Sequence, residues 1–187
     1  MIKAIQKRTS IRHFKSEPLA KDDIEDIIKS GMYAPSSHNK QPWKFYVMQG
    51  KSKNKLVDIY ETKIMSVKNP NVFLIGTLEA MRQAPVIILI YNRLGKDVES
   101  SLDLEERFEE VCNVQSIGAC IENMCIEATS KDIGSLWICD IFRAYKEIHN
   151  YMLKDGQIIA ALALGYSREN YMTKNRLPFD EVVEWYN

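Results

Sequence analysis

The chain has 187 residues, of which 45% are hydrophobic and 27% are charged. Its 25 basic residues balance 25 acidic ones, so no net charge draws the protein to nucleic acid or to a membrane surface. We therefore expect one globular domain over residues 1–187, with neither nucleic acid nor a membrane among its partners.

Cysteine usage and the first ten residues indicate a reduced protein of the cytoplasm. The four cysteines include no C-x-x-C pair, and no histidine or carboxylate stands at zinc-ligand spacing. The stretch MIKAIQKRTS lacks the apolar core of a signal peptide, and the longest apolar run, residues 84–91, is too short to span a bilayer. We expect a cytoplasmic location and no metal site.

The first part of the chain predicts a helix and a strand after a basic opening. Arg8 and Arg12 lie either one helical turn apart or on one side of a sharp turn. Residues 19–35 place isoleucines on one face, carry acidic residues near their start and end at Pro35, which predicts a helix. Aromatic and branched residues over 43–48 predict a strand.

The middle of the chain predicts two further helices and a central strand. Residues 51–65 have a helical pattern, whereas residues 85–92 form a strand too apolar to have a solvated face. The strongest helical pattern covers residues 104–134 and spans roughly 40 Å at 1.5 Å per residue. We expect this segment to be either the central helix or a subunit interface, with Gly134 as its left-handed stop.

The apolar residues of that long helix recur at heptad-like spacing: Phe108, Val111, Val114, Ile117, Ile121, Met124 and Ala128. Small residues at 118–120 would let another helix approach closely. Because helices and strands interleave without strict alternation, we expect an α+β fold with helices around a sheet.

Common nucleotide-binding and hydrolase motifs are absent from the sequence. Residues 50–52, GKS, lack the first glycine of a phosphate loop, and neither G-x-G-x-x-G nor G-x-S-x-G occurs. The three histidines have no partner at a diagnostic spacing, so we expect surface or packing roles for them. No catalytic side chain is predicted.

Three polar clusters remain, and the first lies near the amino terminus. Arg8, Ser10 and Arg12 suit a phosphate, because guanidinium groups bind phosphate oxygens through charge-assisted hydrogen bonds. A solvated basic helix end is the alternative interpretation.

The other two clusters follow the first helix and close the chain. Ser36, Ser37 and Asn39 suit the edge of a polar ligand, or they form an ordinary turn or helix cap. Lys174 and Arg176 alternate, so in an extended segment they would point the same way and offer a second grip on a phosphate.

Taken in this order, the clusters resemble the FMN-dependent nitroreductase family. The pattern R-x-S-x-[RK]-x-F matches residues 8–14, P-S-S-x-N-x-Q-P-W-x-F matches residues 35–45, and K-x-R-x-P is similar to residues 174–178. Residues 132–138, DIGSLWI, resemble the family's glycine turn and short strand after the central helix. The similarity runs nearly from end to end, and the middle motif is the most specific.

The resemblance implies a nitroreductase-like α+β fold with a central mixed or antiparallel sheet, surrounding helices and a long central helix. It also implies an intertwined homodimer with FMN at the subunit interface. One subunit would hold the phosphate, the ribityl chain and the pyrimidine edge with Arg8, Thr9, Ser10, Arg12, Lys174 and Arg176. The other subunit would contribute Pro35, Ser36, Ser37 and Asn39, and Gln41 of the same motif would also bind the cofactor. The region of Trp137 and Ile138 would line the flavin near N5.

The same resemblance implies an NAD(P)H-dependent flavin oxidoreductase. Hydride from NAD(P)H would reach flavin N5 and pass to an electron-poor small molecule, a nitroaromatic or a quinone, by a ping-pong mechanism. Arg12 would stabilise the negative charge that develops at N1–C2=O. The alternatives are other flavin chemistry on this fold (a dehalogenase or a dehydrogenating oxidase), a non-enzymatic FMN carrier or redox sensor, and a nucleic-acid surface, against which the neutral charge counts.

Overall fold

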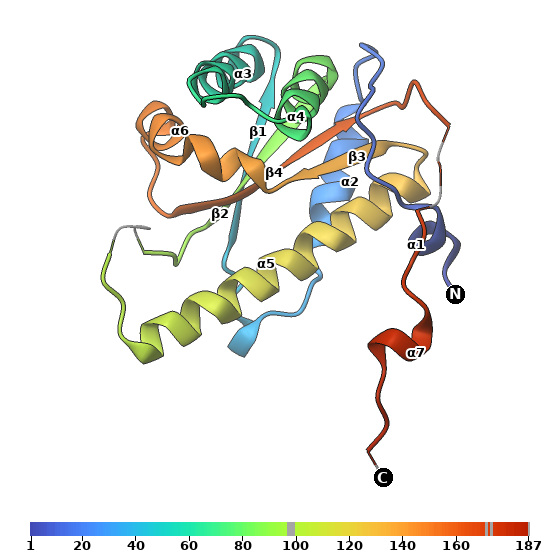
Figure 1. Ribbon diagram of the computed structural model, residues 1–187, viewed down its shortest axis with the longest axis vertical. Helices are drawn as coiled ribbons and strands as arrows, with labels where there is room; N and C mark the ends of the chain where they lie inside the picture. Colours follow the sequence, from blue (N-terminus) through green and yellow to red (C-terminus); the bar gives the residue numbers. More distant parts are fainter. Residues whose placement is uncertain (97–99, 171, 173, 187) are drawn as a thin grey trace.

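A four-stranded antiparallel sheet lies between two layers of helices (Figure 1). The computed structural model describes residues 1–96, 100–170, 172 and 174–186. Its sheet has the order β1-β2-β4-β3. The strands are β1 (Trp43–Gln49), β2 (Val86–Asn92), β3 (Gly134–Ile138) and β4 (Gln157–Gly165). The predicted α+β class is therefore confirmed, and the strands of this sheet pair only in antiparallel fashion.

Strand β2 is central, as its composition predicts, and all seven of its residues are buried. Its side chains alternate between two cores because successive residues of a strand point to opposite faces. Ile88 and Ile90 join the core under one helical layer, whereas Ile87 and Leu89 join the core under the other. This explains why the strand shows no polar face in the sequence.

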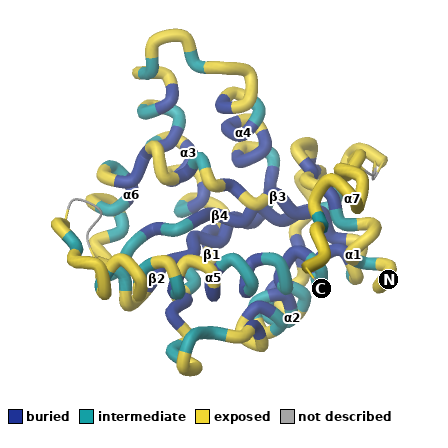
Figure 2. The backbone as a smooth tube through the Cα atoms, turned by 60° about the horizontal axis from the view of Figure 1, so that its bottom comes forward, coloured by how far each residue is buried: buried dark blue, intermediate teal, exposed yellow. Residues whose placement is uncertain are grey.

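Two helices cover one face of the sheet and three cover the other (Figures 1 and 2). The first face carries α2 (Lys21–Met32) and α5 (Leu104–Ser130), and the second carries α3 (Gly50–Met65), α4 (Val72–Gln83) and α6 (Tyr145–Met152). The helices predicted near 19–35, 51–65 and 104–134 are confirmed, whereas α4 and α6 were not predicted. Four short helices complete the chain: α1 (Lys3–Lys7), η1 (Ser37–Asn39), η2 (Asp140–Ala144) and α7 (Phe179–Val182).

The apolar stripe of α5 divides into an exposed part and a buried part. Phe108 and Val111 are 59% and 54% exposed, whereas Ile117 is fully buried. Each step of three residues turns an α-helix by about 300°, so a stripe built from such steps drifts around the helix. The stripe therefore covers the sheet from Ile117 onward and faces away from the sheet before it.

The end of α5 differs from the prediction. The helix ends at Ser130, and the left-handed residue that follows is Asp132, with φ of 56°. Gly134, expected as the left-handed stop, is instead the first residue of β3. It is small because Ile11 passes over it: a Cβ at this position would lie 3.0 Å from Ile11 Cγ1.

Helix α2 packs closely on α5, and the small residue that permits the contact is Gly31 of α2; Gly118 of α5 faces Trp137 of β3 instead of a helix. A Cβ on Gly31 of α2 would lie 2.9 Å from Cys120 Sγ, closer than normal packing allows. Replacing this glycine by alanine would therefore overpack the contact between α2 and α5.

The segment after α1 runs along the edge of the sheet in an extended conformation. The Ile11 amide donates to the Ser135 carbonyl at 3.0 Å, and the Lys15 amide donates to the Tyr166 carbonyl at 2.8 Å. Arg8 and Arg12 consequently do not share a helix, because α1 already ends at Lys7. This strand-like anchoring sets the positions of the residues in the first polar cluster.

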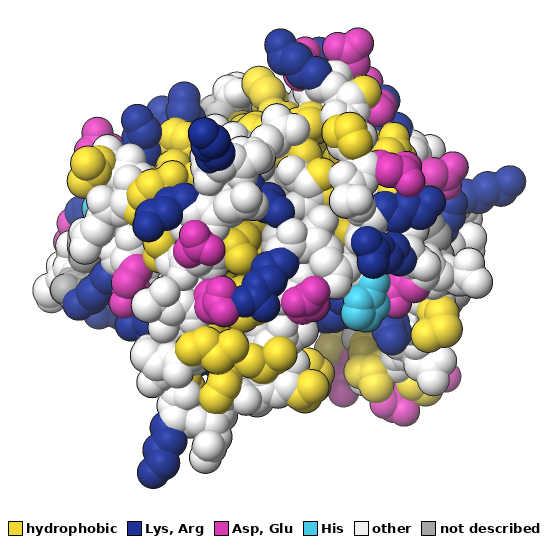
Figure 3. Space-filling model, turned by 90° about the horizontal axis from the view of Figure 1, so that it is seen from above, with side chains coloured by type: hydrophobic (Ala, Val, Ile, Leu, Met, Phe, Trp, Pro, Cys, Tyr) yellow, Lys and Arg dark blue, Asp and Glu magenta, His cyan; other side chains and the backbone are white. Residues whose placement is uncertain are grey.

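The surface carries both charge signs. On the face seen from above in Figure 3, Lys and Arg side chains are interspersed with Asp and Glu. Among the helices of the described residues, none is both long and apolar enough to cross a membrane.

Candidate functional site

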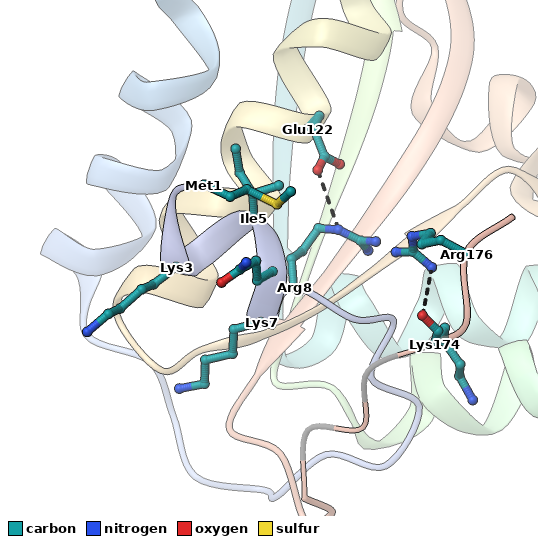
Figure 4. Close-up of a pocket in the computed structure, with 9 residues that line it drawn as sticks. Met1, Lys3, Ile5, Lys7, Arg8, Glu122, Lys174 and Arg176 are labelled. Carbon is teal, nitrogen blue, oxygen red and sulfur yellow. Dashed lines mark hydrogen bonds and ion pairs between the residues drawn. The ribbon is translucent and has the colours of Figure 1, made fainter. Parts of the chain in front are cut away.

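A cationic cavity lies where the two ends of the chain meet (Figure 4). Arg8 enters it from the turn after α1, and Lys174 and Arg176 enter from the carboxyl-terminal tail. The cavity has a volume of about 810 Å³. Its lining residues are Met1, Lys3, Ile5, Gln6, Lys7, Arg8, Glu122, Lys174 and Arg176. The structure thus brings together the first and third polar clusters of the sequence.

Two guanidinium groups face each other in this cavity. Arg8 Nε lies 3.4 Å from the Glu122 carboxylate of α5, and the Arg8 side chain is 23% exposed. Arg176 points toward Arg8, whereas the Lys174 ammonium points away from it (Figure 4). We expected an extended segment to point both charges the same way. The structure instead directs Arg176 toward Arg8 and Lys174 away from it. Among the described residues that line the cavity, Glu122 is the one carboxylate.

A smaller cavity of about 210 Å³ adjoins the same stretch of the chain. Thr9, Ser10 and Arg12 line it together with Lys174. The Arg12 amide donates to the Glu169 carboxylate at 3.2 Å, which ties this stretch to the segment after β4. The predicted residues near the amino terminus therefore border two cavities that share Lys174: Arg8 lines the larger one, and Thr9, Ser10 and Arg12 line the smaller one.

A buried thiol lies close to the cationic cavity. Burial raises the pKa of Cys125 to about 11, although a hydrogen bond with Ser135 opposes the shift. This cysteine is a protonated thiol at neutral pH, so it is no nucleophile for the site.

The polar loop at residues 36–41 has an internally bonded and strained backbone. The Gln41 amide donates to Ser36 Oγ at 3.0 Å, and the Asn39 amide donates to the Ser36 carbonyl at 2.9 Å. His38, Asn39 and Gln41 have φ of 50°, 53° and 47°, in the left-handed region that L side chains rarely adopt. Such backbone outliers cost about 1–3 kcal/mol each and concentrate at functional sites.

Within one chain, the loop lies away from the cationic cavity, beside a more amino-terminal part of α5 (Figure 1). The Ser37 amide donates to Ser116 Oγ at 3.4 Å, and Lys40 Nζ pairs with Glu109 at 2.7 Å. The Lys40 ammonium lowers the pKa of that carboxyl. Glu109 and Glu122, the partner of Arg8, lie about 20 Å apart along the helix at 1.5 Å per residue. The structure therefore does not bring the second cluster to the other two.

Trp137 and Ile138 point to opposite sides of β3. Trp137 is 37% exposed, and its ring lies 3.6 Å from the position of a Cβ on Gly118 of α5. Ile138 is 2% exposed and packs in the core under α3, α4 and α6. Of this predicted pair, only Trp137 has a side chain exposed at the surface.

Sequence reasoning missed three charged residues that shape these sites: Glu122, Glu169 and Arg93. Glu122 reaches Arg8 from α5, Glu169 accepts from the Arg12 amide, and Arg93 donates to the backbone of the polar loop. No local pattern marks them, because each meets its partner only through the fold. Among the described residues, no group of three or more His, Cys, Asp or Glu side chains is placed to hold a metal ion.

Comparisons with known proteins identify the family of the chain. The sequence model of the nitroreductase family matches residues 5–166. A protein of Archaeoglobus fulgidus, provisionally named an NADH dehydrogenase/NAD(P)H nitroreductase, is 28% identical over 73% of this chain and 66% of its own length. YfhC of Bacillus subtilis, provisionally named an NAD(P)H nitroreductase, is 26% identical over 93% of this chain and 88% of its own.

A solved structure shares the fold over nearly its whole length. It is the crystal structure of a provisionally named nitroreductase from Desulfovibrio desulfuricans in complex with FMN, and it is 26% identical in sequence. The superposition has a TM-score of 0.77 and covers 99% of this chain and 95% of that one.

Proposed function

The chain belongs to the nitroreductase family, and on that basis we propose that it is an NAD(P)H-dependent flavin oxidoreductase that binds FMN and reduces a small electron-poor acceptor. The observation that carries this proposal is the meeting of Arg8, Lys174 and Arg176, from opposite ends of the chain, around one cavity. The relative from Desulfovibrio desulfuricans, whose structure is in complex with FMN, supports the choice of cofactor.

The cationic cavity suits the phosphate of FMN. A phosphate monoester carries roughly −1.5 to −2 charges near neutral pH, and two guanidinium groups can bind its oxygens through charge-assisted bonds. Arg8 and Arg176 face each other, and Glu122 is the one carboxylate in the part of the lining that the structure describes, so these residues favour an anion. In this proposal Arg8 and Arg176 bind the phosphate directly, Lys174 adds positive charge where the two cavities adjoin, and Thr9 and Ser10 hold the ribityl chain.

The remaining part of the site requires a second copy of the chain. Because the polar loop is distant from Arg8 along α5, Pro35, Ser36, Ser37, Asn39 and Gln41 would reach the FMN held by the partner of a homodimer. An exposed apolar stripe on α5 offers a contact surface for that partner: Leu104, Phe108, Val111 and Val114. Trp137, exposed beside α5, would then line the flavin ring.

When bound, FMN supplies the hydride chemistry, and the protein supplies binding, orientation and charge. Arg12 would place a positive charge at the pyrimidine edge, where a donor aimed at developing negative charge lowers the barrier most effectively. No side-chain nucleophile is needed for this chemistry. NAD(P)H and the acceptor would occupy the same open position in turn, which predicts ping-pong kinetics.

Spectroscopy and steady-state kinetics test the proposal together. We expect the purified protein to be yellow, to retain FMN through gel filtration, and to oxidise NADH or NADPH when a nitroaromatic or a quinone is present. Initial rates at several acceptor concentrations should give parallel double-reciprocal lines. A protein that takes up no FMN on titration would contradict the proposal. Tight FMN binding without turnover by either nicotinamide would instead indicate a flavin carrier or redox sensor.

A further inference from the structure

Arg93 holds three consecutive carbonyl groups at the end of the polar loop. It follows β2 directly, and its backbone amide donates to the Pro42 carbonyl at 2.8 Å. Its guanidinium donates from Nε to the Gln41 carbonyl at 3.0 Å and from the terminal nitrogen to the Lys40 carbonyl at 2.8 Å. Among the described residues, Arg93 forms no ion pair, and its guanidinium hydrogen-bonds to this stretch of backbone.

The position of Arg93 is itself fixed by a buried residue. Asn92 is fully buried, its amide nitrogen donates to Glu110 at 3.1 Å, and its Oδ1 accepts from the Leu94 amide at 3.1 Å. The turn that carries Arg93 is therefore anchored to both β2 and α5. A guanidinium on this anchored turn can impose a fixed geometry on the loop.

The loop needs such a restraint because its conformation is unfavourable by itself. The Gln41 backbone lies in the left-handed region, directly between the Lys40 and Pro42 carbonyls that Arg93 also holds. Strained φ angles persist only where surrounding contacts over-determine them. Arginine suits this task, since its planar fork presents two donors in a fixed geometry, whereas lysine offers a point charge on a flexible stem.

We propose that Arg93 is a positioning residue, which holds residues 36–41 in the conformation that binds FMN without itself touching the cofactor. This inference rests on the proposed function, in which that loop contributes to the flavin site. It adds a residue outside the polar motif, contributed by the turn after β2, to the set that determines FMN affinity.

FMN titration of three variants tests the role of Arg93 itself. We expect Arg93→Met to weaken FMN binding about tenfold, equivalent to ~1.4 kcal/mol, and Arg93→Lys to weaken it less. Arg143→Met is the matched control, because Arg143 is also exposed but pairs with Asp140 on η2. It should bind FMN like the wild type. An Arg93→Met variant with wild-type affinity would overturn the inference.

Double-mutant cycles separate positioning from a general loss of stability. If Arg93 acts through the loop, Asn39→Ala should weaken FMN binding in the wild type but have little further effect in Arg93→Met. Arg8→Ala, at the other part of the site, should weaken both backgrounds by the same factor. Additive effects of Arg93→Met and Asn39→Ala would overturn the inference. If Arg93→Met does not fold, the same cycles with Arg93→Lys decide the question.

The wild-type titration distinguishes failure of this inference from failure of the proposed function. Wild-type protein that binds no FMN would overturn both. Wild-type protein that binds FMN, with Arg93 variants that bind it equally well, would overturn only the role of Arg93.

Discussion

The polar loop at residues 36–41 and the carboxyl-terminal tail at residues 174–186 are stabilised in opposite ways. The loop is bonded to α5 through Ser116 and to the end of β2 through Arg93. The hydrogen bonds of the tail between described residues are all local, such as those from Arg176 to the Lys174 and Asn175 carbonyls. Trp185 and Tyr186 are 78% and 89% exposed.

One chain by itself fixes the conformation of the loop, whereas the tail needs contacts from outside the chain. The loop is held in a strained conformation before any ligand binds, which is typical of a preorganised site. The tail has a cation directed into a cavity and large apolar side chains in solvent, so it lacks the contacts that would hold it in place. We expect FMN and a second copy of the chain to provide those contacts.

The largest expected effect is the loss of FMN binding in Arg8→Ala, which removes the guanidinium that faces the tail. Two charge-assisted hydrogen bonds to a phosphate contribute about 3 kcal/mol, so FMN affinity should fall about 100-fold. The FMN-to-protein ratio after gel filtration measures this loss. Lys3→Ala is the control, since Lys3 lines the same cavity with its ammonium pointing away (Figure 4). An unchanged ratio in Arg8→Ala would contradict the assigned role.

The second effect concerns the tail and the partner subunit. Trp185→Ala should raise the dissociation constant of the homodimer about 30-fold, because a buried interface tryptophan typically contributes ~2 kcal/mol. Sedimentation velocity over a range of concentrations measures the change. Phe73→Ala at the start of α4 is the control, since Phe73 is similarly exposed but belongs to the opposite helical layer. A flavin-loaded wild-type monomer at micromolar concentration would argue against the dimer.

A smaller effect should follow from the carboxylate in the cationic cavity. Glu122→Gln removes the negative charge that pairs with Arg8, so FMN should bind about fivefold more tightly, an effect of ~1 kcal/mol for a partly exposed charge. The gain should shrink in high salt, because salt screens the interaction. Glu127→Gln on the same helix is the control. Weaker FMN binding by Glu122→Gln would show that the carboxylate orients Arg8 instead.

The last effect, similar in free energy to that of Glu122→Gln, tests strain in the loop. At ordinary positions glycine lowers the free energy of unfolding relative to alanine, but at φ of 50° a Cβ is unfavourable by about 1 kcal/mol. We therefore expect His38→Gly to be more stable than His38→Ala by ~1 kcal/mol in urea unfolding. If alanine proved the more stable of the two, the loop would not be strained at this residue.

The sequence predicted those elements whose pattern is local. The residues of α2, α3 and α5 repeat with the helical period, whereas β1 and β2 are short runs of aromatic and branched residues, so each could be placed from a short window. The α4 helix carries Gly76 in its interior, and α6 has only eight residues, so neither gives a long uninterrupted pattern. The predicted end of α5 at Gly134 was wrong. A glycine stands there because Ile11 passes close to it, and not because the chain turns at this residue.

The site residues likewise fall into those that the local sequence identified and those that only the fold revealed. Residue types and spacing were enough to select Arg8, Ser10, Arg12, Lys174 and Arg176 as anion-binding groups and the stretch 35–41 as a polar loop, because these are chemical properties of short segments. Only the tertiary structure decided that Arg176 faces Arg8 while Lys174 points away, and that Ile138 lies in the core. It also decided that Glu122 pairs with Arg8 and that Arg93 bonds to the polar loop. Such pairings join residues distant in sequence, and their geometry depends on how the helices pack on the sheet.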